Sequence, residues 1–147
     1  MITARSSDKD NGFIGNTCVQ VAEKPTTLAI SVQKGNLTRE MIENTGVFNV
    51  SVLTENVPFE TIRYFGMQSG RDVDKIRDCG LTLAYGAGDA PYVEEAELVL
   101  VCKKLYRAPI LEEGFFYKET VEDNYPNRDF HDLYIGQIVK VLVPEGE

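Results

Sequence analysis

The feature that most constrains the fold is the segment TLAISVQKGNLTREMIENTGVFNVSVL, residues 27–53, which reads as strand, loop, helix and strand. Residues 27–32 alternate between apolar and small or polar side chains, the period of two typical of a half-buried β-strand. Residues 47–53 alternate in the same way. A strand, a loop, a short helix and a second strand are therefore expected within these residues.

The loop inside this segment has the residues of an anion site. Thr38 is the expected N-cap of the helix, and Gly46 stands where a left-handed residue ends it. Free backbone N–H groups at a helix N-terminus, together with Lys34, Asn36 and the Thr38 hydroxyl, suit a phosphate. From this stretch alone the plainer interpretation, a capped surface helix with a solvated lysine, is favoured.

A second candidate anion site lies in the sequence MQSGRDVDK. Ser69 and Gly70 predict a turn, and Asp72 is expected to start another helix. Arg71 stands just ahead of that helix, where its guanidinium could clamp a phosphate through two hydrogen bonds. An ion pair with Asp72 or Asp74 explains Arg71 about equally well.

The rest of the chain adds strands separated by turn signals. Residues 1–4 are expected to end a first strand whose beginning is missing, and Asn11-Gly12 predicts a two-residue hairpin turn. Further strands are expected at residues 13–21, within residues 92–106, where residues 98–102 are continuously apolar, and at residues 133–143. Residues 108–128 form an aromatic excursion that is too long for a hairpin and is expected to be a lid or a subunit contact.

Composition excludes several classes of function. A net charge of −8 makes nucleic acid and anionic membranes poor partners, and no apolar run approaches a membrane span. Three separated cysteines without a CxxC pair argue against disulfides and thiolate metal sites and suit the cytoplasm. No metal site is expected, and residues 1–147 fit a single domain.

His131 is the sole histidine and the one candidate catalytic residue, in DFHDLYIGQI at the start of the last expected strand. From this position it could orient a ligand. A surface histidine bonded to Asp129 or Asp132 explains the same sequence. Nucleophile motifs such as GxSxG are missing from the sequence, so a cofactor would have to carry any chemistry.

Several motifs in one order, together with Asn16-Thr17, span about residues 11–143: SVQKGNLT, TGVFNVSVL, FGMQSGRDVDK, EAELVLVCKKLY and HDLYIGQIVKVL. In this order they resemble the flavin reductase-like family with the FMN-binding split-barrel fold, which includes flavoredoxins and the flavin domain of high-molecular-weight rubredoxins. The resemblance implies a mainly β fold with short helices. It further implies a homodimer of six-stranded antiparallel Greek-key β-barrels, with FMN held noncovalently near the subunit interface.

The resemblance also implies roles for particular residues. The positions beside the isoalloxazine ring correspond to Asn16, Thr17 and Cys18. The phosphate-binding positions correspond to residues of both candidate anion loops: Lys34, Asn36, Thr38, Ser69, Gly70, Arg71 and Lys75. His131 falls near the position of the nicotinamide pocket, where it would place the nicotinamide or another substrate.

The activity implied by this family is an NAD(P)H-dependent flavin reductase. Hydride would pass from NADH or NADPH to flavin N5, and electrons would then leave to free flavin or to a protein acceptor. Hydride transfer needs stacked rings more than a protein acid or base. Two alternatives stay open: an FMN electron carrier without nicotinamide activity, and a cofactor-free barrel that serves as a binding module.

Overall fold

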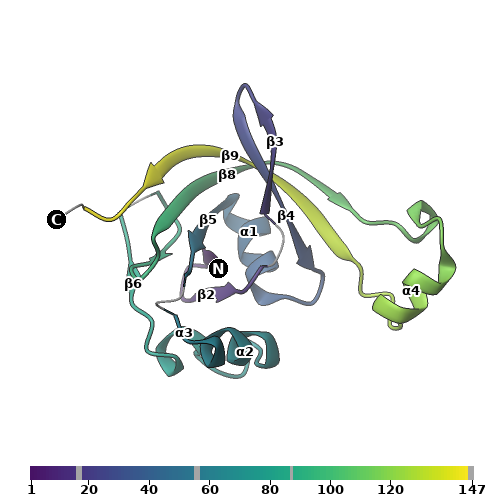
Figure 1. The fold of residues 1–147 in the computed structure, drawn as a ribbon, viewed down its shortest axis with the longest axis horizontal. Helices are drawn as coiled ribbons and strands as arrows, with labels where there is room; N and C mark the ends of the chain where they lie inside the picture. The colour runs from purple at the N-terminus through teal and green to yellow at the C-terminus, as the bar shows by residue number, and fades with distance from the viewer. Residues whose placement is uncertain (16–17, 55–56, 87, 146–147) are drawn as a thin grey trace.

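The computed structural model describes residues 1–15, 18–54, 57–86 and 88–145, and one large antiparallel sheet dominates it (Figure 1). Its strands are β1 Ile2–Arg5, β2 Asp10–Phe13, β3 Cys18–Glu23, β4 Thr26–Gln33, β5 Val47–Val52, β8 Leu98–Pro109 and β9 His131–Leu142. Their order is β2-β1-β5-β8-β9-β4-β3. A separate pair comprises β6 Leu83–Ala84 and β7 Tyr92–Val93. The mainly β prediction is confirmed.

Short helices fill the connections. They are α1 Leu37–Thr45, α2 Phe59–Met67, α3 Lys75–Asp78, the 3-10 turn η1 Glu112–Gly114 and α4 Lys118–Asn124. No helix in the described ranges has the length and apolarity to cross a bilayer. The second predicted helix starts later than expected, because the Asp74 carboxylate, not Asp72, caps it by accepting from Arg77 N at 3.2 Å.

The N-terminal hairpin differs from its prediction. Its turn lies at residues 6–9, where Ser6 N donates to Lys9 O at 2.8 Å, and not at Asn11-Gly12, which pair inside the ladder. A Cβ at Gly12 would lie 3.0 Å from Thr3 Cγ2, so this glycine serves close strand packing. The expected strand at residues 13–21 is divided between β2 and β3, and the described main sheet therefore has seven strands instead of six.

The principal core lies between α1 and the curved sheet. Met41 and Ile42 of α1 pack in one cluster with Ile30, Phe48 and Tyr134 of the sheet, all of them almost fully buried. The helix ends at Gly46 with φ 72°, as predicted. Its N-cap is Asn36 rather than Thr38, because the Asn36 side-chain oxygen accepts a 2.9 Å hydrogen bond from Thr38 N.

Strands β8 and β9 run side by side along the molecule and curve over the core (Figure 1). Their ladder shifts register twice, and such bulges bend a strand pair. Between them, residues 110–130 form an arm that contains η1 and α4 and projects at one end of the molecule (Figure 1). The arm corresponds to the aromatic excursion expected at residues 108–128, of which residues 108 and 109 belong to β8. Its last residue directly precedes His131, the first residue of β9.

Candidate functional site

Two adjoining cavities lie between the sheet, α1 and α2. The His131 cavity, of about 420 Å³, is lined by Phe13, Ile14, Gly15, Ser31, Gln33, Asn36, Phe65, Gly66, Ile110, Tyr125 and His131. The Lys75 cavity, of about 360 Å³, is lined by Asn11, Gln33, Gly35, Asn36, Leu37, Phe65, Gly66, Met67, Gln68, Ser69, Gly70 and Lys75. Four of these residues line both cavities, so together they form one extended site of the size that small ligands occupy.

The Lys75 cavity brings the two candidate anion loops together. Asn36 comes from the loop between β4 and α1, and Ser69, Gly70 and Lys75 come from the loop between α2 and α3 and from the start of α3. In sequence the two loops are separated by α1, β5 and α2, yet they line the same space. This arrangement provides a helix N-terminus and a cation in the lining of one small cavity.

Lys75 is the most unusual residue of the site. Its side chain is only 4% exposed, and burial lowers its pKa more than the nearby Cys79 raises it. The Nζ atom lies 5.1 Å from the centroid of the Phe65 ring. Among the described residues, no carboxylate or other acceptor forms an ion pair or hydrogen bond with it. An ammonium at the end of a largely buried side chain that lines a cavity, without an anionic partner among the described residues, favours a bound anion there.

Asn11 connects the two loops, and it was missing from the predicted site. Its side chain is 3% exposed, and Nδ2 donates to Thr38 Oγ1 at 3.1 Å. A Cβ built on Gly70 would overlap the Asn11 amide, so the turn at Gly70 packs directly on this residue. The Lys9 ammonium, also near β2, donates to Gly70 O. The Asn11-Gly12 pair predicts a turn, and that prediction gives no indication that Asn11 contacts Thr38 and Gly70.

Three predicted anion ligands lie outside the cavity lining. Thr38 is fully buried, and its hydroxyl faces Asn11. Arg71 pairs with Glu40 in the first turn of α1, and not with either aspartate considered from the sequence. Lys34 is exposed, with Nζ 5.9 Å from the centroid of the Phe130 ring. The Arg71–Glu40 pair still keeps the guanidinium next to the N-terminal turn of α1.

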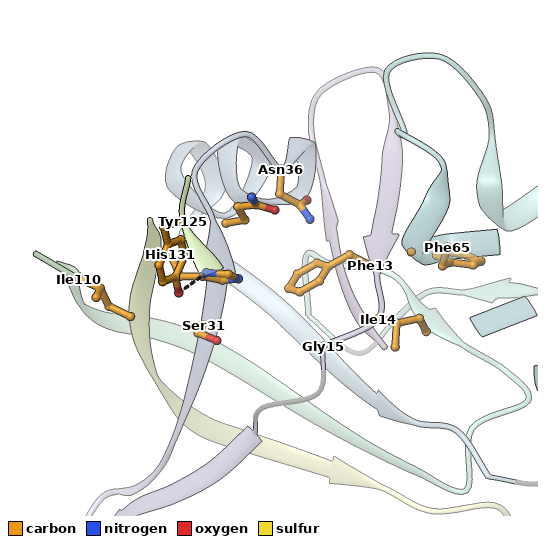
Figure 2. Close-up of a pocket in the computed structure, with 11 residues that line it drawn as sticks. Phe13, Ile14, Gly15, Ser31, Asn36, Phe65, Ile110, Tyr125 and His131 are labelled. Atoms are coloured by element: carbon orange, nitrogen blue, oxygen red, sulfur yellow. Dashed lines mark hydrogen bonds between the residues drawn. The ribbon is translucent and has the colours of Figure 1, made fainter. Parts of the chain in front are cut away.

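His131 lies at the far end of the His131 cavity, and its side chain points into it (Figure 2). Its Nδ1 atom lies 2.9 Å from the Tyr125 hydroxyl oxygen. The aspartates considered from the sequence have other partners: Asp129 accepts from Gln33, and Asp132 accepts from Arg39 at 2.7 Å. Successive side chains alternate across a strand, which is why Asp132 and His131 face different surroundings.

The predicted ring-binding residues are Asn16, Thr17 and Cys18. Asn16 and Thr17 lie outside the described residues. Gly15 immediately precedes them and lines the His131 cavity. Cys18 is an exposed residue at the start of β3, paired with Ile30 of β4, and burial of its thiol raises its pKa more than the chain N-terminus lowers it.

Comparisons with known proteins decide the family. The model of the flavin reductase like domain matches residues 1–147. The chain belongs to the flavin reductase-like family. The high molecular weight rubredoxin of Moorella thermoacetica is 39% identical to it over 143 residues, or 97% of this chain. The chain spans only 54% of that protein's length. The ferric-chelate reductase (NAD(P)H) of Archaeoglobus fulgidus is 28% identical over 123 residues, covering 83% of this chain and 72% of that protein.

Solved structures confirm the predicted fold. A flavoredoxin of Desulfovibrio vulgaris (Miyazaki F) superposes with a TM-score of 0.77 at 23% identity, covering 98% of this chain and 68% of that one. A Shewanella frigidimarina protein with a split barrel domain reaches a TM-score of 0.78 at 18% identity, covering 99% of this chain and 66% of that one. The fold of this chain is therefore the split barrel.

Proposed function

We propose that residues 1–147 act as one flavin-binding oxidoreductase domain, with FMN spanning the two cavities. The phosphate would occupy the Lys75 cavity and the isoalloxazine ring the His131 cavity. The observation that carries this proposal is Lys75, a largely buried lysine with no ionic partner in the described part of the chain, in a cavity that is also lined by the N-terminus of α1. The donor set fits a phosphate, because it combines one cation with a helix N-terminus.

Each residue of the phosphate end has a stated task in this proposal. Lys75 neutralises the phosphate charge, and Asn36 and Ser69 donate from the two loops. Gly70, which has no side chain, lets its turn pack directly on Asn11. Arg71 adds its guanidinium at the rim, at the expense of its exposed pair with Glu40.

The remaining predicted residues stay in the proposal with supporting tasks. Thr38, fixed by Asn11, keeps the phosphate loop in shape, and Lys34 adds positive charge near the cavity. Asn16, Thr17 and Cys18 are proposed to lie along the polar edge of the ring, next to Gly15.

The proposed activity is an NAD(P)H-dependent flavin reductase. FMN, when bound, would supply the hydride and electron chemistry between NADH or NADPH and an acceptor such as free flavin or a protein. The chain itself would bind and orient FMN and the second substrate and would exclude water from the site. His131 would place the nicotinamide or another second substrate. The name of the Archaeoglobus relative, a ferric-chelate reductase (NAD(P)H), supports this choice of donor.

An FMN electron carrier without nicotinamide activity is the second candidate. The structural similarity to a flavoredoxin favours it. A homodimer is proposed for either activity, because Val19 and Val21 on the edge strand β3 are 56% and 50% exposed, a surface that a second copy could cover. A cytoplasmic location is proposed because Cys18, Cys79 and Cys102 are free thiols.

The decisive experiment mixes the purified protein with FMN and then with NADH or NADPH under anaerobic conditions. The proposal expects FMN to stay with the protein through gel filtration and the flavin absorbance to bleach with at least one nicotinamide. Retained FMN without bleaching would select the carrier. A protein that remains colourless after incubation with FMN would refute both candidates and favour a cofactor-free barrel.

A further inference from the structure

The arm carries a residue whose position gives it a task in the site. We propose that Tyr125 is a positioning residue that selects one tautomer of the His131 ring, with Nε2–H directed into the His131 cavity toward a carbonyl or carboxamide oxygen of the second substrate. This inference rests on the proposed function of that cavity. It assigns the selection of the second substrate to the arm, residues 110–130.

The geometry of the pair supports this assignment. The Tyr125 hydroxyl oxygen lies 2.9 Å from His131 Nδ1, a normal hydrogen-bond distance. Figure 2 shows the second ring nitrogen of His131 on the opposite side of the imidazole, pointing away from Tyr125 into the space in front of Phe13. Both side chains line the same cavity. One nitrogen is therefore occupied by the arm, and the other is available to a ligand.

The surroundings of the Tyr125 hydroxyl favour the tautomer of His131 with its proton on Nε2. Among the described residues, His131 Nδ1 is the only acceptor within reach of the Tyr125 O–H. If Nδ1 carried the proton, the hydroxyl proton of a half-buried tyrosine would lose its partner, at a cost in free energy. A neutral imidazole has one donor and one acceptor nitrogen, so an O–H donated to Nδ1 leaves the proton on Nε2. The cavity then receives a donor, which suits an oxygen acceptor.

The arm holds Tyr125 firmly enough to act in this way. Tyr125 N donates to Val121 O at 2.8 Å at the end of α4. Its ring lies 4.8 Å from that of Phe130 and 6.0 Å from that of Phe115, measured between centroids. Phe130 is 6% exposed and anchors this cluster at the base of the arm. The phenol is therefore held by Phe115 and Phe130 in addition to its edge contact with the His131 ring, whose centroid lies 5.7 Å away.

A second set of contacts ties the arm to the start of β9. Ile110 N donates to His131 O at 3.0 Å. Arg128 pairs with Glu112 at 3.1 Å and with Glu122 at 2.5 Å, which joins the two sides of the arm. The backbone and the side chain of His131 are thus both held by arm residues.

The test uses the fact that His131 is the only histidine in the sequence. In protein labelled with ¹⁵N-histidine, a long-range ¹H–¹⁵N spectrum at a pH where the ring is neutral reports this one imidazole. The proposal expects a protonated Nε2 and an unprotonated Nδ1 in the wild type. Tyr125→Phe keeps the ring in its aromatic cluster and removes the hydroxyl, so it should shift the spectrum toward a mixture of tautomers.

A matched control is Tyr117→Phe, because Tyr117 lies on the same arm but is 73% exposed. Its spectrum should equal that of the wild type. A wild-type spectrum with the proton on Nδ1, or a Tyr125→Phe spectrum identical to the wild type, would overturn the proposal.

A kinetic measurement tests the role toward the second substrate. In the FMN-loaded protein, Tyr125→Phe should raise KM for the nicotinamide about tenfold, the scale of one lost hydrogen bond, while the affinity for FMN stays the same. An equal loss of FMN affinity, or an unchanged KM, would overturn the role toward the second substrate. A wild type that oxidises neither nicotinamide would refute the proposed reductase, whereas the tautomer is decided by the spectrum alone.

Discussion

Replacement of Lys75 by methionine separates binding from folding, because the two effects have opposite signs. Lys75 is 4% exposed and has no partner for its ammonium among the described residues, so the ligand-free protein keeps a poorly solvated charge. Methionine has a similar length and is apolar, and it removes this cost. The ligand-free variant should therefore be at least as stable as the wild type.

Binding should change in the other direction. A charge-assisted hydrogen bond to a phosphate contributes about 1.5–3 kcal/mol, so Lys75→Met should weaken FMN about 10- to 150-fold. Riboflavin, which has no phosphate, should bind both proteins equally. Quenching of flavin fluorescence measures both dissociation constants, and thermal unfolding measures stability. Lys140→Met, at an exposed lysine of β9, is the control and should change neither.

The pH dependence supplies a third readout for the same residue. Burial lowers the folded-state pKa of Lys75 below its ordinary value of 10.5, so the unfolded state binds more protons between these two values. The stability of the ligand-free wild type should therefore rise with pH across this interval, and Lys75→Met should lack this contribution. A variant that unfolds more easily yet binds FMN normally would refute the reasoning, since Lys75 would then be a structural residue.

Three further predictions follow from contacts in the structure. Arg71→Ala should weaken FMN by about 1–3 kcal/mol in a titration and leave the melting temperature unchanged, because its exposed pair with Glu40 contributes little to stability. Gly136→Ala would place a Cβ 2.6 Å from Phe48 Cζ, so urea unfolding should show a loss of about 1–3 kcal/mol. Burial would raise the pKa of Asp132, but hydrogen bonds from its two arginine partners outweigh it and hold the pKa below 3.8. Since the stability from this carboxylate is lost as the pH falls through that lower value, Asp132→Asn should be destabilised at neutral pH and show a flatter acid limb in pH-dependent unfolding.

Local patterns predicted the parts of the fold whose signals lie close together in sequence. The strand before Lys34, the helix that ends at Gly46 and the strand after it all depend on periodicity and capping within a few residues. The exact N-cap was wrong by two positions, because Asn36 and Thr38 both carry oxygen acceptors and only the backbone conformation distinguishes them. The turn predicted at Asn11-Gly12 was also wrong, because the turn lies at residues 6–9 and these two residues pair within the β1–β2 ladder.

The site itself depends on contacts that no local pattern contains. Asn11 meets Thr38 and Gly70 across long stretches of chain, and its sequence neighbours give no sign of this. Tyr125 was recognised only as one aromatic residue of an excursion, since its hydrogen bond to His131 requires the arm to fold back onto β9. Lys75 was proposed from family resemblance, but its burial without a partner became visible only in the structure.

The bridge formed by Asn11 has a consequence for the rate and entropy of ligand capture. Asn11 contacts both loops, so the loops are expected to be ordered before a ligand binds. Binding would then lose little backbone conformational entropy. Amide hydrogen exchange in residues 34–38 and 69–75 would then be slow already in the empty protein. The binding site is therefore expected to be preorganised and not to close around its ligand.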